Sequence, residues 1–410
     1  MRAYERFLKY AKYPTMSDES STTTPSTAKQ LVLARDLTDE LRELGLHAEM
    51  DEHGYVYAHL EPTAEGVNAI GFIAHMDTSS EASDENIKPT VVDYRGGDIL
   101  LNEEKGIYMR VSDYPYLADY AGKHLIVSDG TTLIGADDKA GIAEIMTALE
   151  RIIAEDIPHG RISVAFTPDE EIGAGADHFD ISRFGADYAY TVDGGALGEL
   201  EYENFNAASA RIRINGVSIH PGSAKGMMKN AARIAAELCA MLPEGEIPEL
   251  TEGYEGFYHL LHIEGGCEEA TMSFIIRDHD MSLFENRKAA FKEVAGRLNE
   301  KYGEGTVELT LTDSYYNMRE KIEDNMFIVE RAAEAMRSLG IEPHVMPIRG
   351  GTDGSRLSFM GLPCPNLCTG GVNFHSRFEY VAVEDMDAIS DLLVALVRGA
   401  VTDGYREVKP

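Results

Sequence analysis

The chain has 410 residues, 44% of them hydrophobic and 26% charged, so it can bury a large core and is long enough for two or more domains. Asp and Glu number 70 against 37 Lys and Arg, and the net charge of -33 argues against nucleic acid or a membrane surface as a partner, because both are anionic. We expect a cytoplasmic protein, since no apolar run has signal-peptide or membrane-spanning length and the four cysteines form neither a disulfide framework nor a zinc-knuckle pattern.

The first half of the chain alternates strand-like and helix-like patterns. Asn68 to Ala74 is a short apolar run, which predicts a buried strand that ends at His75. Apolar residues then follow the spacing of one helix face at Ile142, Ile145, Met146, Leu149, Ile152 and Ile153. Arg161 to Phe166 and Ala186 to Val192 predict two more strands. This alternation is typical of an α/β fold.

The pattern changes after about residue 206. We expect six elements there, in the order strand, helix, strand, strand, helix and strand, over residues 210–214, 229–242, 257–264, 270–277, 283–301 and 306–312. This order is that of a split, ferredoxin-like α+β module. Helical spacing of apolar residues resumes near the end of the chain, at Met386, Ile389, Leu393 and Leu396. We therefore predict an inserted domain at residues 206–318 within a discontinuous domain of residues 1–205 and 319–410.

Five short segments place an imidazole or a carboxylate at the expected end of a strand or in the loop that follows. These residues are His75 and Asp77, Asp137, Glu170 and Glu171, Asp193, and His375. Imidazole and carboxylate groups suit zinc, and five protein ligands can hold two ions if one carboxylate bridges them. Each segment alone is weak evidence, because a single His or Asp at a strand end is usually structural or solvated. Spacing in the sequence leaves open whether the five segments meet.

The order of five motifs makes the pattern specific. They are HMDT (75–78), GADDKAG (135–141), DEEIG (169–173), VDGG (192–195) and FHS (374–376). In this order they resemble the family of two-zinc aminopeptidases, carboxypeptidases and deacylases, and the likeness includes GVSIHPGSAKGMMKNA (216–231) in the inserted module. The resemblance implies a catalytic domain with a mixed sheet flanked by helices, and a ferredoxin-like inserted domain that acts as a lid or in dimerisation.

The resemblance also implies a role for each metal ligand. Asp137 matches the carboxylate that bridges two zinc ions. His75 and Asp193 match the other ligands of one site, and Glu171 and His375 match those of the second. Cobalt or manganese can substitute for zinc, because these ions accept similar ligands.

Two further acids and one peptide bond have counterparts in the family. Asp77 matches the carboxylate that orients His75 from its second ring nitrogen. Glu170 matches the general base that takes a proton from the water bridging the two ions and passes it to the departing amine. The alternative for Glu170, a solvated loop acid, would leave hydrolysis without a proton shuttle. The peptide between Asp137 and Asp138 is cis in such relatives, and we expect it here.

Three further residues are candidates for binding the substrate. His220 matches a histidine that reaches the scissile carbonyl, and Arg277 matches an arginine that clamps the terminal carboxylate of the peptide. Without the resemblance, an arginine at a strand end is usually a surface residue. Arg349 begins the glycine-rich segment RGGTDGS, which lacks the ending and the strand context of a phosphate-binding loop and gives a second, weaker candidate for carboxylate binding.

The motifs favour a tripeptide aminopeptidase, because GADDKAG and HPGSAKGMMKNA are typical of that branch of the family. A dipeptidase or an N-acyl amino acid deacylase on the same scaffold is the alternative. A non-enzymatic metal-binding relative would need a missing ligand or base, and none is missing. Small peptides are the expected binding partners. The sequence does not distinguish a monomer from a homodimer.

Overall fold

The computed structural model describes residues 1–409 and divides them into two compact units. Unit 1 comprises Met1–Tyr202, Met318–Met346 and the chain from Thr352 onward, and unit 2 comprises Glu203–Asn317 and Pro347–Gly351. Unit 2 thus spans nearly the stretch that the sequence marks as inserted, together with five residues from the glycine-rich segment around Arg349.

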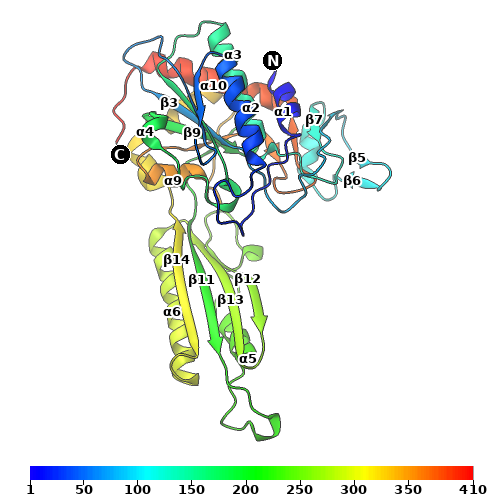
Figure 1. Ribbon diagram of the computed structural model, residues 1–410, viewed down its shortest axis with the longest axis vertical. Coiled ribbons are helices and arrows are strands. Elements are labelled where there is room, and N and C mark those ends of the chain that lie inside the picture. The colour runs from blue at the N-terminus through cyan, green and yellow to red at the C-terminus, as the bar shows by residue number, and fades with distance from the viewer. Residues whose placement is uncertain (410) are drawn as a thin grey trace. The chain divides into compact units, whose positions relative to one another are not determined.

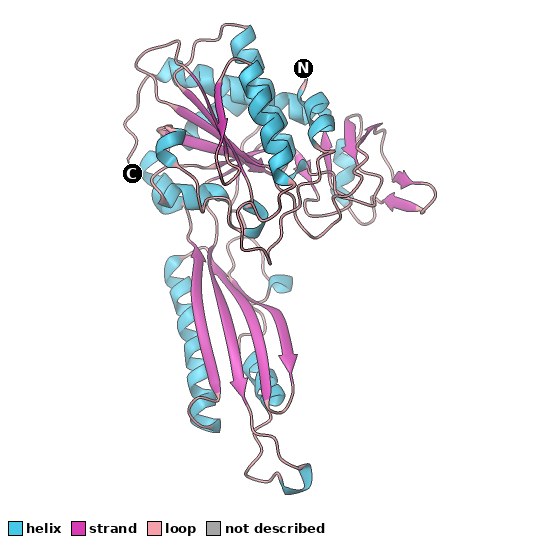
Figure 2. Ribbon diagram, in the orientation of Figure 1, coloured by secondary structure: helices cyan, strands magenta, loops and turns pink. Residues whose placement is uncertain are grey.

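An eight-stranded mixed sheet forms the centre of unit 1 (Figures 1 and 2). Its spatial order is β1 (His47–Met50), β2 (Val56–Leu60), β8 (Ile162–Thr167), β3 (Ile70–His75), β9 (Tyr188–Gly194), β16 (Asn366–Cys368), β10 (Glu199–Glu201) and β15 (His344–Val345). Strands β8, β3, β9 and β16 run parallel. Every residue of β3 and β8 is buried, as expected for parallel strands covered on both faces. The three strands predicted in this half of the chain are confirmed.

Helices cover this sheet. They are α1 (Ala3–Tyr10), α2 (Gln30–Glu43), α3 (Ala136–Ala154), α4 (Ile181–Phe184), α7 (Arg319–Ile322), α8 (Phe327–Ser338), α9 (Asp353–Phe359) and α10 (Val383–Asp403). Helix α3 packs on β3 and β9, and α1 and α10 pack beside α3. The apolar face predicted for α3 is buried from Ile142 to Ile152, while Ile153 is only half-buried. No helix within residues 1–409 is long and apolar enough to cross a membrane.

A smaller sheet and a hairpin complete unit 1. The sheet has the order β17 (Gly371–Val372), β18 (Tyr380–Ala382), β7 (His124–Val127) and β4 (Thr90–Asp93), and the hairpin pairs β5 (Ile99–Asn102) with β6 (Ile107–Met109). A 3₁₀ turn, η1 (Pro115–Tyr120), lies between β6 and β7. Buried side chains of β7, β18 and η1 share one apolar cluster. Val372 and Phe378 pack against it, so the cluster holds the chain on either side of residue 375.

Unit 2 is an antiparallel four-stranded sheet with two helices packed on it (Figure 2). In chain order its elements are β11 (Asn206–Asn215), α5 (Ala231–Met241), β12 (Phe257–Gly265), β13 (Glu269–Asp278), α6 (Met281–Tyr302) and β14 (Val307–Tyr315). The strands lie in the order β12, β13, β11, β14. Alternate residues of β13, from Ala270 to Ile276, are buried among side chains of the two helices. The predicted ferredoxin-like order of elements is confirmed.

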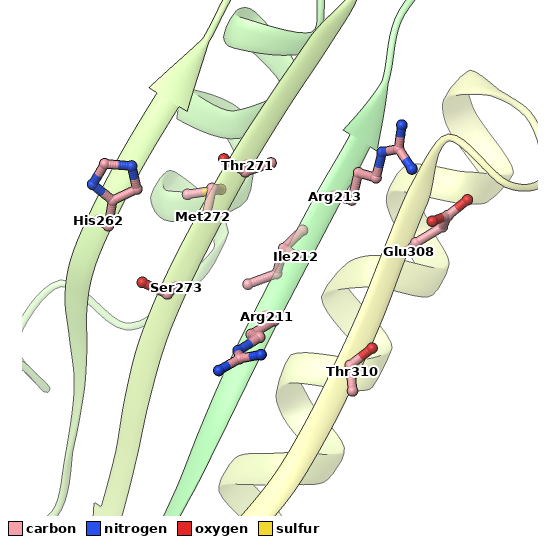
Figure 3. A pocket seen from close by; sticks show the side chains of 9 residues that line it. All are labelled: Arg211, Ile212, Arg213, His262, Thr271, Met272, Ser273, Glu308 and Thr310. Atoms are coloured by element: carbon pink, nitrogen blue, oxygen red, sulfur yellow. The ribbon is translucent and has the colours of Figure 1, made fainter. Parts of the chain in front are cut away.

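The other face of the unit 2 sheet is polar. Arg211 lies opposite Ser273 on β13 and Thr310 on β14, and the next row on the same face holds Arg213 and Thr271. These side chains line a shallow hollow of about 350 Å³ (Figure 3). The guanidinium of Arg213 pairs with the exposed Glu269 carboxylate.

Candidate metal centre

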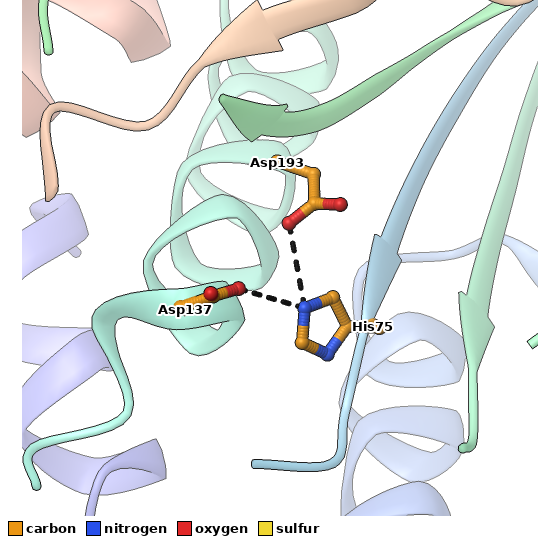
Figure 4. Close-up of side chains that lie close together, drawn as sticks. All are labelled: His75, Asp137 and Asp193. Carbon is orange, nitrogen blue, oxygen red and sulfur yellow. Dashed lines mark hydrogen bonds and ion pairs between the residues drawn. The ribbon is translucent and has the colours of Figure 1, made fainter. Parts of the chain in front are cut away.

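Three of the predicted ligands meet where β3 and β9 end beside the start of α3. His75 is the last residue of β3, Asp193 lies near the end of the adjacent parallel strand β9, and Asp137 lies in the first turn of α3. The side chains point toward one another (Figure 4). His75 Nε2 lies 2.8 Å from Asp137 Oδ1 and 3.3 Å from Asp193 Oδ1. Because parallel neighbouring strands end at one sheet edge, β3 and β9 deliver these groups together.

A second group shares Asp137 with the first. His375 Nε2 lies 2.8 Å from Glu171 Oε2 and 3.3 Å from Asp137 Oδ2. In each group of three residues, the candidate ligand atoms lie within 4.8 Å of one another. Asp137 therefore offers Oδ1 to one group and Oδ2 to the other, which is the arrangement that a bridging carboxylate needs. The sequence prediction named these five residues, and the structure brings all five together.

The chemistry of this cluster fits metal ions. Burial raises the pKa of Glu171 to about 7 and that of Asp193 to about 6, and the nearby Asp137 carboxylate adds to both shifts. Glu171 Oε1 is buried and has no hydrogen-bond partner among the described residues. Buried carboxylates that repel one another are stabilised by cations, and two imidazoles with three carboxylates form a donor set typical of divalent metals such as zinc.

The two histidines respond to the same carboxylates. Hydrogen bonding to Asp137 and Glu171 raises the pKa of His375 to about 11. Burial alone would lower the pKa of His75, but the Asp193 and Asp137 carboxylates raise it well above its ordinary value. The local field of the cluster thus strongly favours positive charge at the position between the two imidazoles.

Asp77 holds the segment that carries Glu170 and Glu171. Its Oδ1 accepts the backbone N–H of Glu170 at 3.0 Å, and its Oδ2 accepts that of Glu171 at 3.2 Å. The same Oδ1 lies 3.3 Å from His75 Nδ1, the ring nitrogen that faces away from Asp137. The Asp77 carboxylate thus lies where the resemblance expects a group that orients His75. The Asp77 carbonyl oxygen is nearer to His75 Nδ1, at 3.0 Å, and the carboxylate also fixes the turn that follows β8.

Asp138 supports the histidine from the other side. Its Oδ2 accepts the backbone N–H of His75 at 3.1 Å, and the side chain is fully buried. The peptide bond between Asp137 and Asp138 is cis, as expected from the resemblance.

Glu170 lies beside the ligands without joining them. Its side chain has no hydrogen bond or ion pair to any described residue, whereas the next residue, Glu171, pairs with His375. Burial raises the pKa of Glu170 well above its ordinary value, and the Asp193 carboxylate raises it further. A carboxylate with no partner of its own is free to exchange a proton with a substrate.

Two carboxylates that contact this centre were not predicted from the sequence. Glu81 Oε2 lies 3.5 Å from His375 Nδ1, the ring nitrogen opposite the one that faces Glu171. Glu379 accepts three backbone N–H groups of the loop that leads to Asp137. Glu81 lies in an irregular segment without a pattern, but the spacing of four residues between His375 and Glu379 could have drawn attention to the second acid.

The three predicted substrate-binding residues lie in unit 2. His220 is exposed to solvent, and its Nδ1 accepts the backbone N–H of Gly222 at 3.1 Å in the 3₁₀ turn η3 (Pro221–Ser223). Arg277 Nη1 donates to the carbonyl of Arg349 at 2.9 Å, and Arg277 Nε is buried without a hydrogen-bond partner among the described residues.

Arg349 itself holds a loop of unit 2. Its Nη1 donates to the carbonyls of Gly253 and Glu255, and its Nη2 donates to the carbonyl and the hydroxyl of Thr251. These four bonds favour a structural role for Arg349 over carboxylate binding, so Arg277 is the better candidate of the two arginines.

Comparison with solved structures identifies the class of fold. The chain superposes with a TM-score of 0.65 on a dinuclear metal-binding M20 peptidase of Bacillus subtilis, at 15% identity, over 98% of this chain and 97% of that one. It also superposes with a TM-score of 0.77 on the aminopeptidase PepT of Bacillus cereus, at 25% identity, over 97% and 98% of the two chains. Residues 202–306 match the peptidase dimerisation domain of the M20 class. The chain thus has the M20 metallopeptidase fold.

Sequence relatives narrow the class to one family. A peptidase T of Caldanaerobacter subterraneus subsp. tengcongensis is 58% identical over 97% of this chain and 98% of its own. A peptidase T of Geobacillus kaustophilus is 55% identical over 96% of this chain and 97% of its own. The chain belongs to the peptidase T family.

Proposed function

We propose that this chain is a zinc-dependent aminopeptidase that removes the amino-terminal residue from tripeptides. The observation that carries the proposal is the sharing of Asp137 between two groups of candidate ligands, one with His75 and Asp193 and one with Glu171 and His375. The similarity to peptidase T over almost the whole chain supports the peptide substrate.

Proton transfer is the task that we assign to Glu170. Two metal ions held by a shared carboxylate lower the pKa of a water molecule and polarise a carbonyl group. Glu170 then takes the proton of the attacking water and returns it to the departing amine. Its position supports this role, because Asp77 fixes the Glu170 backbone N–H at 3.0 Å while the side chain stays free of partners among the described residues.

Binding of the substrate is assigned to unit 2. The Gly222 N–H donates to His220 Nδ1, so the neutral ring carries its proton on Nε2 and can donate it to a carbonyl oxygen. Arg277 keeps donors that its bond to the Arg349 carbonyl does not use, and a guanidinium is suited to a terminal carboxylate. The match to a peptidase dimerisation domain supports a homodimer as the form in solution.

A side-by-side assay tests the proposal. The purified chain is incubated with Ala-Ala-Ala, Ala-Ala, N-acetyl-Ala-Ala-Ala and N-acetylalanine, and the released alanine is measured. We expect fast release from Ala-Ala-Ala and almost none from the acetylated tripeptide, because an aminopeptidase needs a free amino terminus. Faster hydrolysis of Ala-Ala or of N-acetylalanine would instead support the dipeptidase or the deacylase.

A further inference from the structure

Glu379 occupies an unusual place beside the metal centre. Its carboxylate is almost completely buried, at 2% exposure, and comes from the chain just before β18. Oε2 accepts the backbone N–H groups of Ile134 at 3.0 Å and Gly135 at 2.8 Å, and Oε1 accepts that of Asp137 at 3.0 Å. One side chain therefore accepts hydrogen bonds from three backbone amides of a loop that lies 242 to 245 residues earlier in the sequence.

These three hydrogen bonds fix the backbone at the start of α3. The first N–H groups of a helix have no partner inside the helix, and other groups of the protein must accept them. The backbone there also departs from the helix, since Gly135 has a φ of +70° and Asp137 a ψ of 102°. Glu379 accepts the N–H of Asp137 itself and those of Ile134 and Gly135 just before the helix, so it fixes the backbone from which the Asp137 carboxylate reaches both groups of ligands.

Glu379 is also close in sequence to a ligand of the second group. It follows His375 by four residues, and its own N–H donates to the carbonyl of Ser376 at 3.1 Å, which closes the turn between them. His375 lies in the left-handed region of backbone space, with a φ of +59°, and a residue other than glycine keeps that conformation only where its surroundings hold it. The loop of the shared ligand and the loop of His375 thus meet at one carboxylate.

We propose that Glu379 is a positioning residue that couples the two metal sites, by holding the Asp137 loop and the His375 turn in one arrangement. This inference rests on the metal centre proposed above. Outer carboxylates of this kind affect metal affinity or activity by roughly 10- to 100-fold. We expect the affinity for both metal ions to fall, because Asp137 belongs to both groups of candidate ligands.

The test compares Glu379→Gln with the wild-type chain. Glutamine keeps the size of the side chain but places an NH₂ group against backbone donors, so at least one of the three amides loses its acceptor. Metal-depleted protein is titrated with Co²⁺, and its visible absorption reports the number of bound ions, their affinity and their coordination. We expect weaker binding of both ions by roughly 10- to 100-fold, a changed spectrum, and recovery of peptidase activity as metal is added in excess.

Glu144→Gln is the matched control. Glu144 is a fully buried glutamate in the same helix, α3, and neither of its carboxylate oxygens has a hydrogen-bond partner among the described residues. This control should bind Co²⁺ like the wild type. A folded Glu379→Gln protein that binds two ions with the affinity and spectrum of the wild type would overturn the proposal.

Folding of the variants is followed by circular dichroism before each titration. If Glu379→Gln does not fold, Glu379→Asp takes its place, since the shorter carboxylate keeps its acceptors but withdraws them by one methylene. If neither variant folds, Glu379 serves the stability of unit 1 and a positioning role is wrong. A wild-type chain that binds no Co²⁺ would instead contradict the proposed metal centre, so the two failures are distinguishable.

Discussion

The metal centre of unit 1 and the polar sheet face of unit 2 both gather charged side chains, but they do so in opposite ways. In unit 1 the carboxylates are largely shielded from solvent, and their partners come from distant parts of the chain, as with Glu171, whose side chain is 4% exposed and pairs with the partly exposed His375. On the unit 2 face the side chains of Arg213 and Glu269 pair across adjacent strands while 58% and 51% exposed. Water solvates the second pair and screens its charges.

The difference shows which polar cluster carries chemistry. Burying a carboxylate is costly unless another group compensates its charge, so several buried carboxylates that converge on one point indicate a functional site. The hollow on the unit 2 sheet has the volume of a binding site but lacks convergent buried groups. Substitutions should therefore have large effects in the first region and small ones in the second.

Glu170→Gln should give the largest effect. The amide keeps the shape of the side chain but cannot accept a proton, so we expect kcat to fall by roughly 10²- to 10⁴-fold. Both metal ions should stay bound, because Glu170 belongs to neither group of ligands. Steady-state kinetics on Ala-Ala-Ala and a metal count per chain check this. Activity like that of the wild type would remove Glu170 from the mechanism.

Asp77→Asn should have the next largest effect. The amide leaves one oxygen for the two backbone N–H groups of Glu170 and Glu171, and it weakens the orientation of His75. We expect metal affinity to fall by roughly 10- to 100-fold, measured by competition with a chelating dye. Unchanged affinity would show that the backbone alone holds this turn.

Glu144→Gln should change stability rather than activity. Burial raises the pKa of Glu144 well above its ordinary value, so the folded chain keeps a proton that the unfolded chain releases above about pH 4. The wild type therefore loses stability as pH rises, whereas the variant does not titrate. We measure urea unfolding of both proteins at pH 5 and pH 8. The stability of the variant relative to the wild type should rise between these pH values, by at most about 1.4 kcal/mol per pH unit.

An exposed glutamate provides the control for that experiment. Glu334 lies on the exposed side of α8, and Glu334→Gln should leave the pH dependence of unfolding as in the wild type. The interpretation of Glu144 as a buried neutral acid is wrong if its variant and the control have the same pH profile.

Arg213→Ala should give the smallest effect. It removes an ion pair from the exposed face of the unit 2 sheet, and such pairs contribute little to stability. We expect nearly unchanged activity and unfolding midpoint. A marked loss of peptidase activity would show that this face takes part in function.

The ligands of the metal centre follow recognisable local patterns, although each pattern alone is weak evidence for a metal site. His75 and Asp193 come at the ends of apolar strands, and Asp137 begins a helix with a regular apolar face. The order of strands and helices in unit 2 could also be predicted, since these elements are long and periodic. That the five ligands converge in space, however, could be predicted only from the family resemblance.

The supporting contacts could not be predicted, since they join residues far apart in the sequence. Glu379 and Ile134 are separated by 245 residues, and no spacing rule connects them. The sequence also gave no prediction for the short strands β4 to β7, because three or four residues are too few to establish a period. The place of residues 347–351 in unit 2 depends on tertiary contacts such as those of Arg349.

The most direct test of the account is metal stoichiometry coupled to activity. The chain is depleted of metal with a chelator, Zn²⁺ is added in steps, and bound metal and hydrolysis of Ala-Ala-Ala are measured on the same samples. We predict an inactive depleted protein and a return of activity that is complete at two ions per chain. Full activity after prolonged chelation, or activity that never depends on added metal, would contradict the central claim.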